Sequence, residues 1–167
     1  MNTIDNINED GAALARVDAL LAGYGAILDA GEISRWPELF SQECSYAIYP
    51  AVDYERGLPL AYMLDDCHAR LRDRVTFVNE VWKGTVESYR TRHVCQRTSA
   101  ERDLTQPDLI NVSTNFLVAF TQADGTSSIL CSGSTEDTIT LAGESALFNS
   151  RRVLLDGTPA RYLVYPL

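Results

Sequence analysis

Apolar side chains recur every three or four residues in two long segments of the chain, which is the spacing of an amphipathic helix. The first, residues 12–30, stops before Gly31, a residue typical of the position that follows a helix. Residues 34–40 predict a short second helix. The other long segment, residues 60–78, predicts a third helix, whose polar side consists of Asp65, Asp66, His68, Arg70, Arg72 and Asp73.

Beyond Gly84 the apolar period changes to two, the pattern of β-strands with one buried face. Residues 44–49 form an earlier, short strand that Pro50 stops. The later strands are predicted over residues 86–98, 109–120, 128–141 and 145–156. In the clearest of them, one face carries Ile110, Val112, Thr114, Phe116, Val118 and Phe120. In the strand after it, the buried side is expected to carry Ile129, Cys131, Ile139 and Leu141.

Asp124 and Gly125 between two strands predict a tight hairpin turn. Helices that come first and antiparallel hairpins that follow indicate an α+β fold. A long curved sheet wrapped on helices forms a cone, whose interior either holds a pocket or is filled by side chains. We expect residues 1–10 to be a flexible polar lead and residues 11–167 to be a single domain.

The chain carries 14 basic and 23 acidic residues, a net charge of −9. Nucleic acids and anionic lipids select basic surfaces, so neither is an expected partner. The N-terminal residues lack the pattern of a signal peptide and no apolar run reaches 18 residues, so we expect a cytoplasmic protein without a membrane span. The four cysteines form no Cys-x-x-Cys motif and are expected to be reduced core thiols.

The chain has two histidines, His68 and His93, and they lie 25 positions apart with no partner at helical spacing. Zinc and mononuclear iron sites need two or three histidines with a carboxylate, so we expect no metal and no cofactor in this chain. His68 is expected to face solvent and His93 to have a hydrogen-bonded structural role.

Acid–base chemistry inside a cone stays open, because several tyrosines, the histidines and Asp29 are available. Asp29 ends the first helix, where a negative charge is unfavourable. It therefore marks either a functional group or an ion pair with an arginine. The candidates are Tyr24, Tyr46, Tyr49, Asp29, His68 and His93.

The strand that begins near residue 86 has an unusual composition. Arg90 and Arg92 share one face, while His93 and Cys95 share the other. Two arginines on one face need carboxylates or a partner surface. Asp65, Asp66 and Asp73 of the third predicted helix are the candidates within the chain.

Several short segments together resemble a known family. The order Trp36-Pro-Glu-Leu-Phe40 and Cys44-x-Tyr46 is similar to the opening of cone-shaped domains related to nuclear transport factor 2 (NTF2). More specifically, the chain resembles the small (beta) subunits of Rieske-type aromatic-ring-hydroxylating oxygenases, nearest to the branch of salicylate hydroxylases and terephthalate dioxygenases. The segments that carry this resemblance are residues 55–61 (ERGLPLA), 71–75 (LRDRV), 89–93 (YRTRH) and 165–167 (YPL).

The resemblance implies an NTF2-like cone and a structural role within an assembly, not a catalytic role. In that family the large (alpha) subunit carries the Rieske 2Fe–2S cluster and the catalytic iron, and the assembly is commonly three large and three small chains, with the small chains forming a trimer. No catalytic, cofactor or metal residue is therefore expected in this chain. Four residues are expected to fasten strand to helix or to meet a neighbouring chain: Arg74, Arg90, Arg92 and His93.

Two rival functions remain: a stand-alone acid–base enzyme, such as a dehydratase or isomerase, and a module that binds a small ligand. The enzyme predicts an open polar pocket in which His93 or His68 reaches an Asp or Tyr. The ligand-binding module predicts an open, mostly apolar cavity. The subunit predicts a filled cone, with apolar or Arg-rich patches on the outside.

Overall fold

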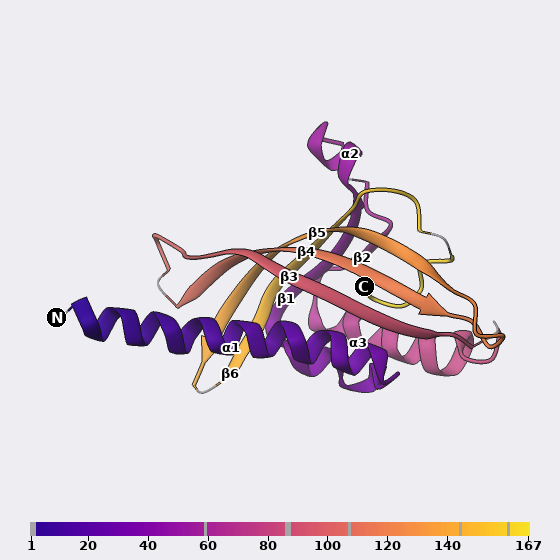
Figure 1. Ribbon diagram of the computed structural model, residues 1–167, viewed down its shortest axis with the longest axis horizontal. Helices are drawn as coiled ribbons and strands as arrows, with labels where there is room; N and C mark the ends of the chain where they lie inside the picture. The colour runs from indigo at the N-terminus through magenta and orange to yellow at the C-terminus, as the bar shows by residue number, and fades with distance from the viewer. Residues whose placement is uncertain (1–2, 59, 86–87, 107, 144, 160) are drawn as a thin grey trace.

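The computed structural model describes residues 3–58, 60–85, 88–106, 108–143, 145–159 and 161–167. Helices and short strands come first and four long strands follow (Figure 1). The elements are α1 (Thr3–Asp29), the 3-10 helix η1 (Ile33–Leu39), β1 (Phe40–Pro50), α2 (Ala51–Glu55), β2 (Met63–Asp65), α3 (His68–Thr76), the π-helical segment η2 (Phe77–Trp82), β3 (Arg90–Arg102), β4 (Leu109–Thr121), β5 (Ser127–Ala142) and β6 (Ser145–Leu155).

The strands form one curved, six-stranded sheet in the order β2-β1-β6-β5-β4-β3. Only the β1–β6 pair is parallel among these described strands, and the other neighbours are antiparallel. The sheet arches over α1 and α3, which lie under the same face, while α2 projects from the opposite side (Figure 1). This arrangement confirms the predicted α+β cone with a mostly antiparallel sheet.

The first helix ends as predicted but begins earlier. Gly31 adopts a φ of +71°, and its backbone N–H donates to the Leu28 carbonyl at 3.0 Å, which closes the end of α1. At the other end, the backbone of residues 3–10 is helical, where a flexible lead was expected. No proline interrupts these residues, and once a helix is nucleated each further residue adds a hydrogen bond.

The predicted third helix is shorter than its apolar spacing suggested. Residues 63–65 instead form strand β2, which pairs antiparallel with β1 and places Tyr46 opposite Asp65. The helix begins only at His68. Asp65 was expected on the exposed side of a helix, and this expectation is wrong: the residue is 4% exposed. Pairing with the edge of β1 outweighs the local helical period at these residues.

The long strands follow the predicted alternation, with one exception. The inner face of β4 is as expected, since Ile110, Val112, Thr114, Val118 and Phe120 are buried. In β5, however, a bulge opposite Val118 and Ala119 shifts the register. Leu130 turns inward there, and Ile129, expected in the core, is 55% exposed. An extra residue on one strand reverses the faces of its neighbours.

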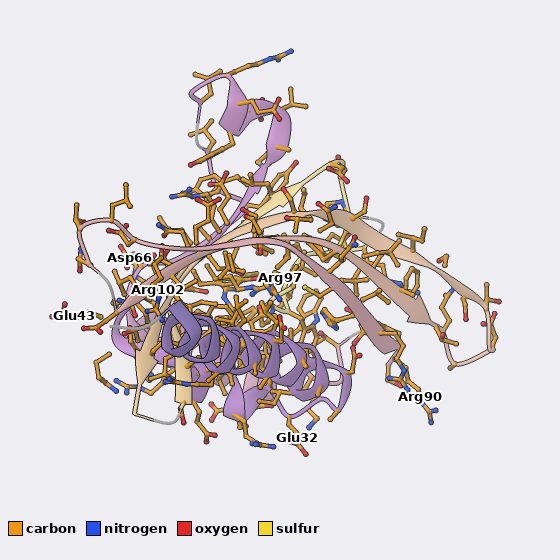
Figure 2. The ribbon with its side chains drawn as sticks, turned by 60° about the vertical axis from the view of Figure 1, so that its left-hand side comes forward. Glu32, Glu43, Asp66, Arg90, Arg97 and Arg102 are labelled. Atoms are coloured by element: carbon orange, nitrogen blue, oxygen red, sulfur yellow. The ribbon has the colours of Figure 1, made fainter. Side chains whose placement is uncertain are left out.

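Both apolar packing and a charged pair hold helix α1 against the sheet. Val17 is fully buried under the sheet. Arg97 of β3 donates from Nε and Nη2 to the two carboxylate oxygens of Asp18 at 2.7 and 3.1 Å, and Figure 2 shows it beside the helix. Residues 11–29 are long and apolar enough to cross a membrane by composition alone. In this fold they supply the helix that covers the core.

The core under the helices is aromatic. Trp36 packs edge-on against Phe40 and Tyr46, with ring centroids 5.4 and 5.1 Å apart. The apolar segment that ends the chain enters this core. The hydroxyls of Tyr24 and Tyr46 donate to the Leu167 carbonyl at 2.7 and 3.3 Å, and Leu167 is 4% exposed. The segment thus closes part of the cone.

Candidate functional site

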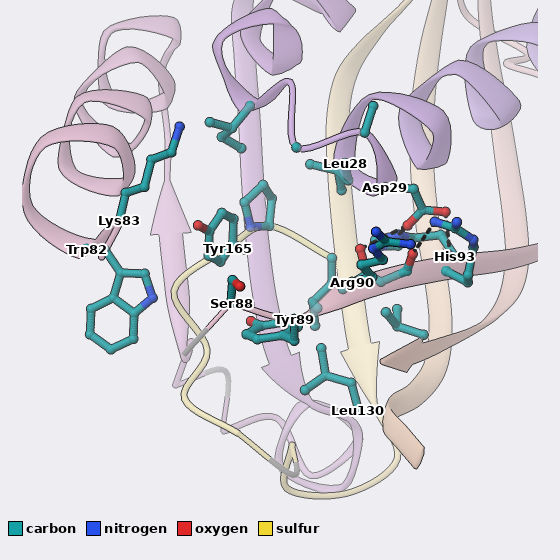
Figure 3. Close-up of a pocket in the computed structure, with 18 of the residues that line it drawn as sticks. Leu28, Asp29, Trp82, Lys83, Ser88, Tyr89, Arg90, His93, Leu130 and Tyr165 are labelled. Carbon is teal, nitrogen blue, oxygen red and sulfur yellow. Dashed lines mark hydrogen bonds and ion pairs between the residues drawn. The ribbon is translucent and has the colours of Figure 1, made fainter. Parts of the chain in front are cut away.

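A pocket of about 480 Å³ lies where the end of α1, the start of β3 and residues 165–167 meet (Figure 3). This volume lies in the range of small-molecule sites. Of the two alternatives left open for the cone, a pocket or a filled interior, the structure has a pocket, which departs from the filled cone that the subunit hypothesis predicts. The pocket lining consists of residues 28–31, Ile33, residues 82–84, residues 88–93, Val118, Leu130 and residues 165–167.

Asp29 and His93 form the polar centre of this lining. His93 Nδ1 and Asp29 Oδ1 are 2.6 Å apart, and the backbone N–H of His93 donates to Asp29 Oδ2 at 3.0 Å. The Thr91 hydroxyl donates to Asp29 Oδ1, also at 3.0 Å. Three donors from β3 thus compensate for a carboxylate at the unfavourable end of a helix. Two alternatives were left open for Asp29, a functional group or an ion pair with an arginine, and among the described residues its partner is His93 and not an arginine.

The pair with Asp29 fixes how the His93 ring is protonated. Since the carboxylate accepts the Nδ1 proton, the neutral ring carries its lone pair on Nε2. This Nε2 is buried and has no hydrogen-bond partner among the described residues. Burial lowers the pKa of His93 below its ordinary 6.5, against the opposing pull of Asp29. At neutral pH the ring is therefore an uncharged acceptor.

The contact between α1 and β3 depends on a glycine. A Cβ atom at Gly25 would lie 3.2 Å from the Cβ of His93. The absence of a side chain at Gly25 lets the helix approach the strand at His93, which brings Asp29, one turn further along, into range. A glycine inside an otherwise apolar helix was the sequence signal of this close approach.

Basic residues outnumber acidic residues in the pocket lining. Lys83, Arg90 and Arg92 contribute to its lining, whereas Asp29 is the one acidic residue among the described residues that line it. In a chain with a net charge of −9, such a local excess of positive charge is unusual. Sequence reasoning singled out both arginines but missed Lys83, Trp82 and Tyr165, because Trp82 and Lys83 lie far from Tyr165 along the chain and neither segment carries a site motif.

The four residues expected to have a structural role differ in whether they have a partner within the chain. Arg74 fastens α3 to β2 through Asp65, and His93 fastens β3 to α1, so both join strand to helix within the chain. Arg90 and Arg92 are exposed, and within the described residues no carboxylate lies in ion-pair distance of either. Figure 2 shows Arg90 at the end of β3, pointing away from the body of the molecule.

Three of the other candidate acid–base side chains form hydrogen bonds outside the Asp29–His93 pair. His68 was expected in solvent but is half-buried, with Nε2 at 3.1 Å from the Pro37 carbonyl. The hydroxyls of Tyr24 and Tyr46 bind Leu167. The described residues contain no group of three or more His, Cys, Asp or Glu side chains placed to hold a metal ion.

The cysteines divide evenly between core and surface. Cys44 and Cys131 are buried, as expected of core thiols, but Cys67 and Cys95 are exposed, which corrects the expectation for those two. All four are free thiols. Cys95 shares a strand face with His93, yet it lies in the part of β3 that the core does not cover.

Two exposed apolar regions lie outside the pocket. The first is the arm, defined as residues 51–58 and 60–62, which includes α2 and projects from the sheet (Figure 1). Its exposed large apolar residues are Val52, Leu58, Leu60 and Tyr62. The second is the outer patch on the opposite face of the sheet from α1, made of Arg92, Val94, Leu117, Ala119 and Ile129, which adjoin across β3, β4 and β5.

Comparison with known proteins finds relatives whose sequences match along most of this chain. Anthranilate 1,2-dioxygenase small subunit from Burkholderia cepacia is 27% identical over 96% of this chain and 98% of its own length. Terephthalate 1,2-dioxygenase terminal oxygenase component subunit beta 2 from Comamonas sp. is 25% identical over 86% of this chain and 90% of its own.

A solved structure agrees with these relatives. It is a beta subunit assigned to an aromatic-ring-hydroxylating dioxygenase from Novosphingobium aromaticivorans, with a TM-score of 0.82, 26% identity, and coverage of 93% of this chain and 96% of its own. The NTF2-like fold is confirmed. The family model described as "Ring hydroxylating beta subunit" matches residues 25–159. The chain therefore belongs to the family of ring-hydroxylating beta subunits.

Proposed function

We propose that this chain is the non-catalytic small subunit of a cytoplasmic, multicomponent aromatic-ring-hydroxylating oxygenase. The observation that carries this proposal is the family match over residues 25–159. His68 supports it, since its ring bonds a backbone carbonyl. The His93–Asp29 pair in a pocket is what the rival acid–base enzyme predicts, and the family match outweighs it. The Rieske cluster and the mononuclear iron then belong to the large subunit, where the oxygen chemistry takes place.

The substrate of the complex is proposed to be an aromatic carboxylate. Both relatives are subunits of enzymes named for such compounds, anthranilate and terephthalate. Substrate contacts lie in the large subunit under this proposal. The contribution of the small subunit is to bury surface and to hold the large subunits in place.

The assembly is proposed to contain three large and three small chains, with the small chains arranged around a threefold axis. Exposed apolar residues support this. Leu60 of the arm is 79% exposed and Val94 of the outer patch is 61% exposed. A soluble monomer seldom keeps clustered apolar side chains in water, and their burial is what stabilises a permanent interface.

Arg92 is a further candidate for this interface. It lies in the outer patch, in register with Ala119, which is in turn in register with Ile129. Arginine is enriched in interfaces because its planar guanidinium forms several hydrogen bonds at once. Within the described residues Arg92 donates to the Thr91 carbonyl at 2.8 Å, and a partner surface would supply the carboxylate.

Co-expression with a Rieske-type large subunit tests the proposal. We expect the two chains to purify together, with a native mass equal to three copies of each. Oxygen consumption with an aromatic carboxylate should require the large subunit. Recovery of this chain as a lone monomer that turns over an aromatic substrate by itself would overturn the proposal.

A further inference from the structure

Residues 161–167, here named the latch, follow β6 and belong to no helix or strand themselves. Among the described residues, no backbone–backbone hydrogen bond involves the latch. Its far end is nevertheless part of the hydrophobic core, where Leu167 is 4% exposed. The latch is therefore held in place by side chains of other elements, and these contacts lie at two points.

The inner point of attachment is a pair of tyrosine hydroxyls. Tyr24 of α1 and Tyr46 of β1 both donate to the Leu167 carbonyl, and the Leu167 backbone N–H donates to the Tyr46 hydroxyl at 2.8 Å. Burial raises the pKa of both phenols above the ordinary value of 10, so both hydroxyls keep their protons at neutral pH. Both backbone polar groups of Leu167 are thus satisfied by side chains that lie far from it in the sequence.

A buried ion pair holds the ring of Tyr24 in position. The guanidinium carbon of Arg151 lies 4.1 Å from the centroid of this ring. Arg151 Nη1 donates to Asp137 Oδ2 at 3.0 Å, and the two side chains are 5% and 0% exposed. A cation over an aromatic face binds more strongly when water is excluded. The pair therefore fixes the tyrosine whose hydroxyl binds Leu167.

Arg161 forms the outer point of attachment, at the other end of the latch. Its guanidinium carbon lies 5.1 Å from the centroid of the Tyr89 ring and 4.8 Å from that of Phe120. Its Nη2 donates to Gln122 Oε1 at 2.8 Å. Tyr89 precedes β3, Phe120 lies near the end of β4, and Gln122 follows that strand. The latch thus begins on the sheet and ends on the core tyrosines.

The latch also supplies part of the pocket lining, through Tyr165, Pro166 and Leu167 (Figure 3). We propose that the latch opens as a unit while the sheet stays folded, and that its opening joins the pocket to the hydroxyls of Tyr24 and Tyr46. Segments with few backbone hydrogen bonds open at a lower free energy than core strands do. This inference does not rest on the proposed function, since it uses only contacts within the chain.

Amide hydrogen exchange of the full chain, followed by NMR at several low urea concentrations, tests the inference. The Leu167 amide is the reporter, because its hydrogen bond to Tyr46 must break before exchange. Relative to its intrinsic rate, it should exchange at least about tenfold faster than the amides of Val112 and Thr114 in β4. Its exchange should also depend little on urea, since opening of the latch exposes much less surface than global unfolding does.

Arg161→Met tests whether the two ends of the latch open together. It removes the outer attachment and should accelerate exchange at Leu167, at the other end, about tenfold. Arg152→Met is the matched control. Arg152 also has its guanidinium over a ring, that of Tyr54 at 5.1 Å, and also donates to a side chain, that of Glu136, but it lies in β6. This control should leave exchange at Leu167 unchanged.

Gln122→Ala is a milder change at the outer point, and it decides the question even if Arg161→Met fails to fold. It removes one hydrogen bond of Arg161 and should accelerate exchange at Leu167 several-fold.

Three outcomes would overturn the inference. Exchange at Leu167 with the rate and urea dependence of the β4 amides would mean that the latch opens only when the whole chain unfolds. No acceleration in the variants at the outer point would mean that the end of the latch moves alone. A Leu167 amide without protection in the wild type would mean that the latch does not close. Co-purification with a large subunit is a separate measurement, so failure of this inference is distinguishable from failure of the proposed function.

Discussion

Arg74 of α3 holds Asp65 of β2 through two parallel hydrogen bonds. Nη2 donates to Oδ1 at 3.0 Å and Nε donates to Oδ2 at 2.5 Å. The side chains are 20% and 6% exposed, so the pair is shielded from water. It joins the edge strand of the sheet to the helix that follows it, one of the two roles that the family resemblance suggested for Arg74.

Arg74→Met should lower the free energy of unfolding by about 3 kcal/mol, because it leaves the Asp65 carboxylate buried and unpaired. Urea denaturation measures this change. Arg70→Met removes an exposed pair with Asp66 and should cost well under about 1 kcal/mol. Equal effects of the two substitutions would show that the buried pair does not hold β2 to α3.

His93 should titrate below its ordinary pKa of 6.5, since burial disfavours the charged ring. The unfolded chain then binds the proton more readily than the folded chain. The His93 contribution to stability is therefore complete above about pH 6.5 and declines as the pH falls through the interval below it. NMR titration of the imidazole resonances measures the pKa, with His93→Gln to assign them.

Asp29→Asn should lower the pKa of His93 further, because Asp29 favours the charged ring through its hydrogen bond and its charge. The same NMR titration checks this shift. A wild-type pKa above 6.5 would mean that Asp29 outweighs burial, and a rise of the pKa in the variant would mean that Asp29 does not favour the charged ring.

Gly133→Ala should destabilise the fold by about 3 kcal/mol, at the upper end of overpacking costs. A Cβ atom at this position would lie 2.0 Å from the backbone oxygen of Leu154, so strand β6 would have to move. Thermal or urea unfolding gives the change.

Gly23→Ala is the matched control, because nothing lies within 4 Å of a Cβ atom there. Alanine is favoured over glycine inside a helix, so this variant should be more stable by up to about 1 kcal/mol. A stable Gly133→Ala protein would disprove the close contact between β5 and β6.

Val52→Asp combined with Leu60→Asp should reduce recovery of the complex with a large subunit several-fold, because charges would be introduced into the apolar arm. The two residues are 49% and 79% exposed, so the stability of the isolated chain should change little. Co-purification yield and native mass give the result.

Leu104→Asp makes the same chemical change at a residue that is 99% exposed in the loop between β3 and β4, and should leave assembly intact. If the arm variant assembles as well as the wild type, the arm is not part of the interface.

The sequence by itself determined the features that depend on near neighbours along the chain. Gly31 predicted the end of α1, and the alternation over residues 109–120 predicted both faces of β4. Its short segments were sufficient to indicate the family. Turn chemistry and side-chain period act within a few residues, so they can be interpreted without knowing the fold.

Only the tertiary structure decided the rest. Residues 63–65 form a strand because β1 offers an edge to pair with, and Leu130 replaces Ile129 in the core because of a bulge opposite β4. Asp29 and His93 meet across 64 positions because α1 crosses β3 at Gly25. Such contacts depend on how whole elements pack, and local periodicity carries no information about distant partners.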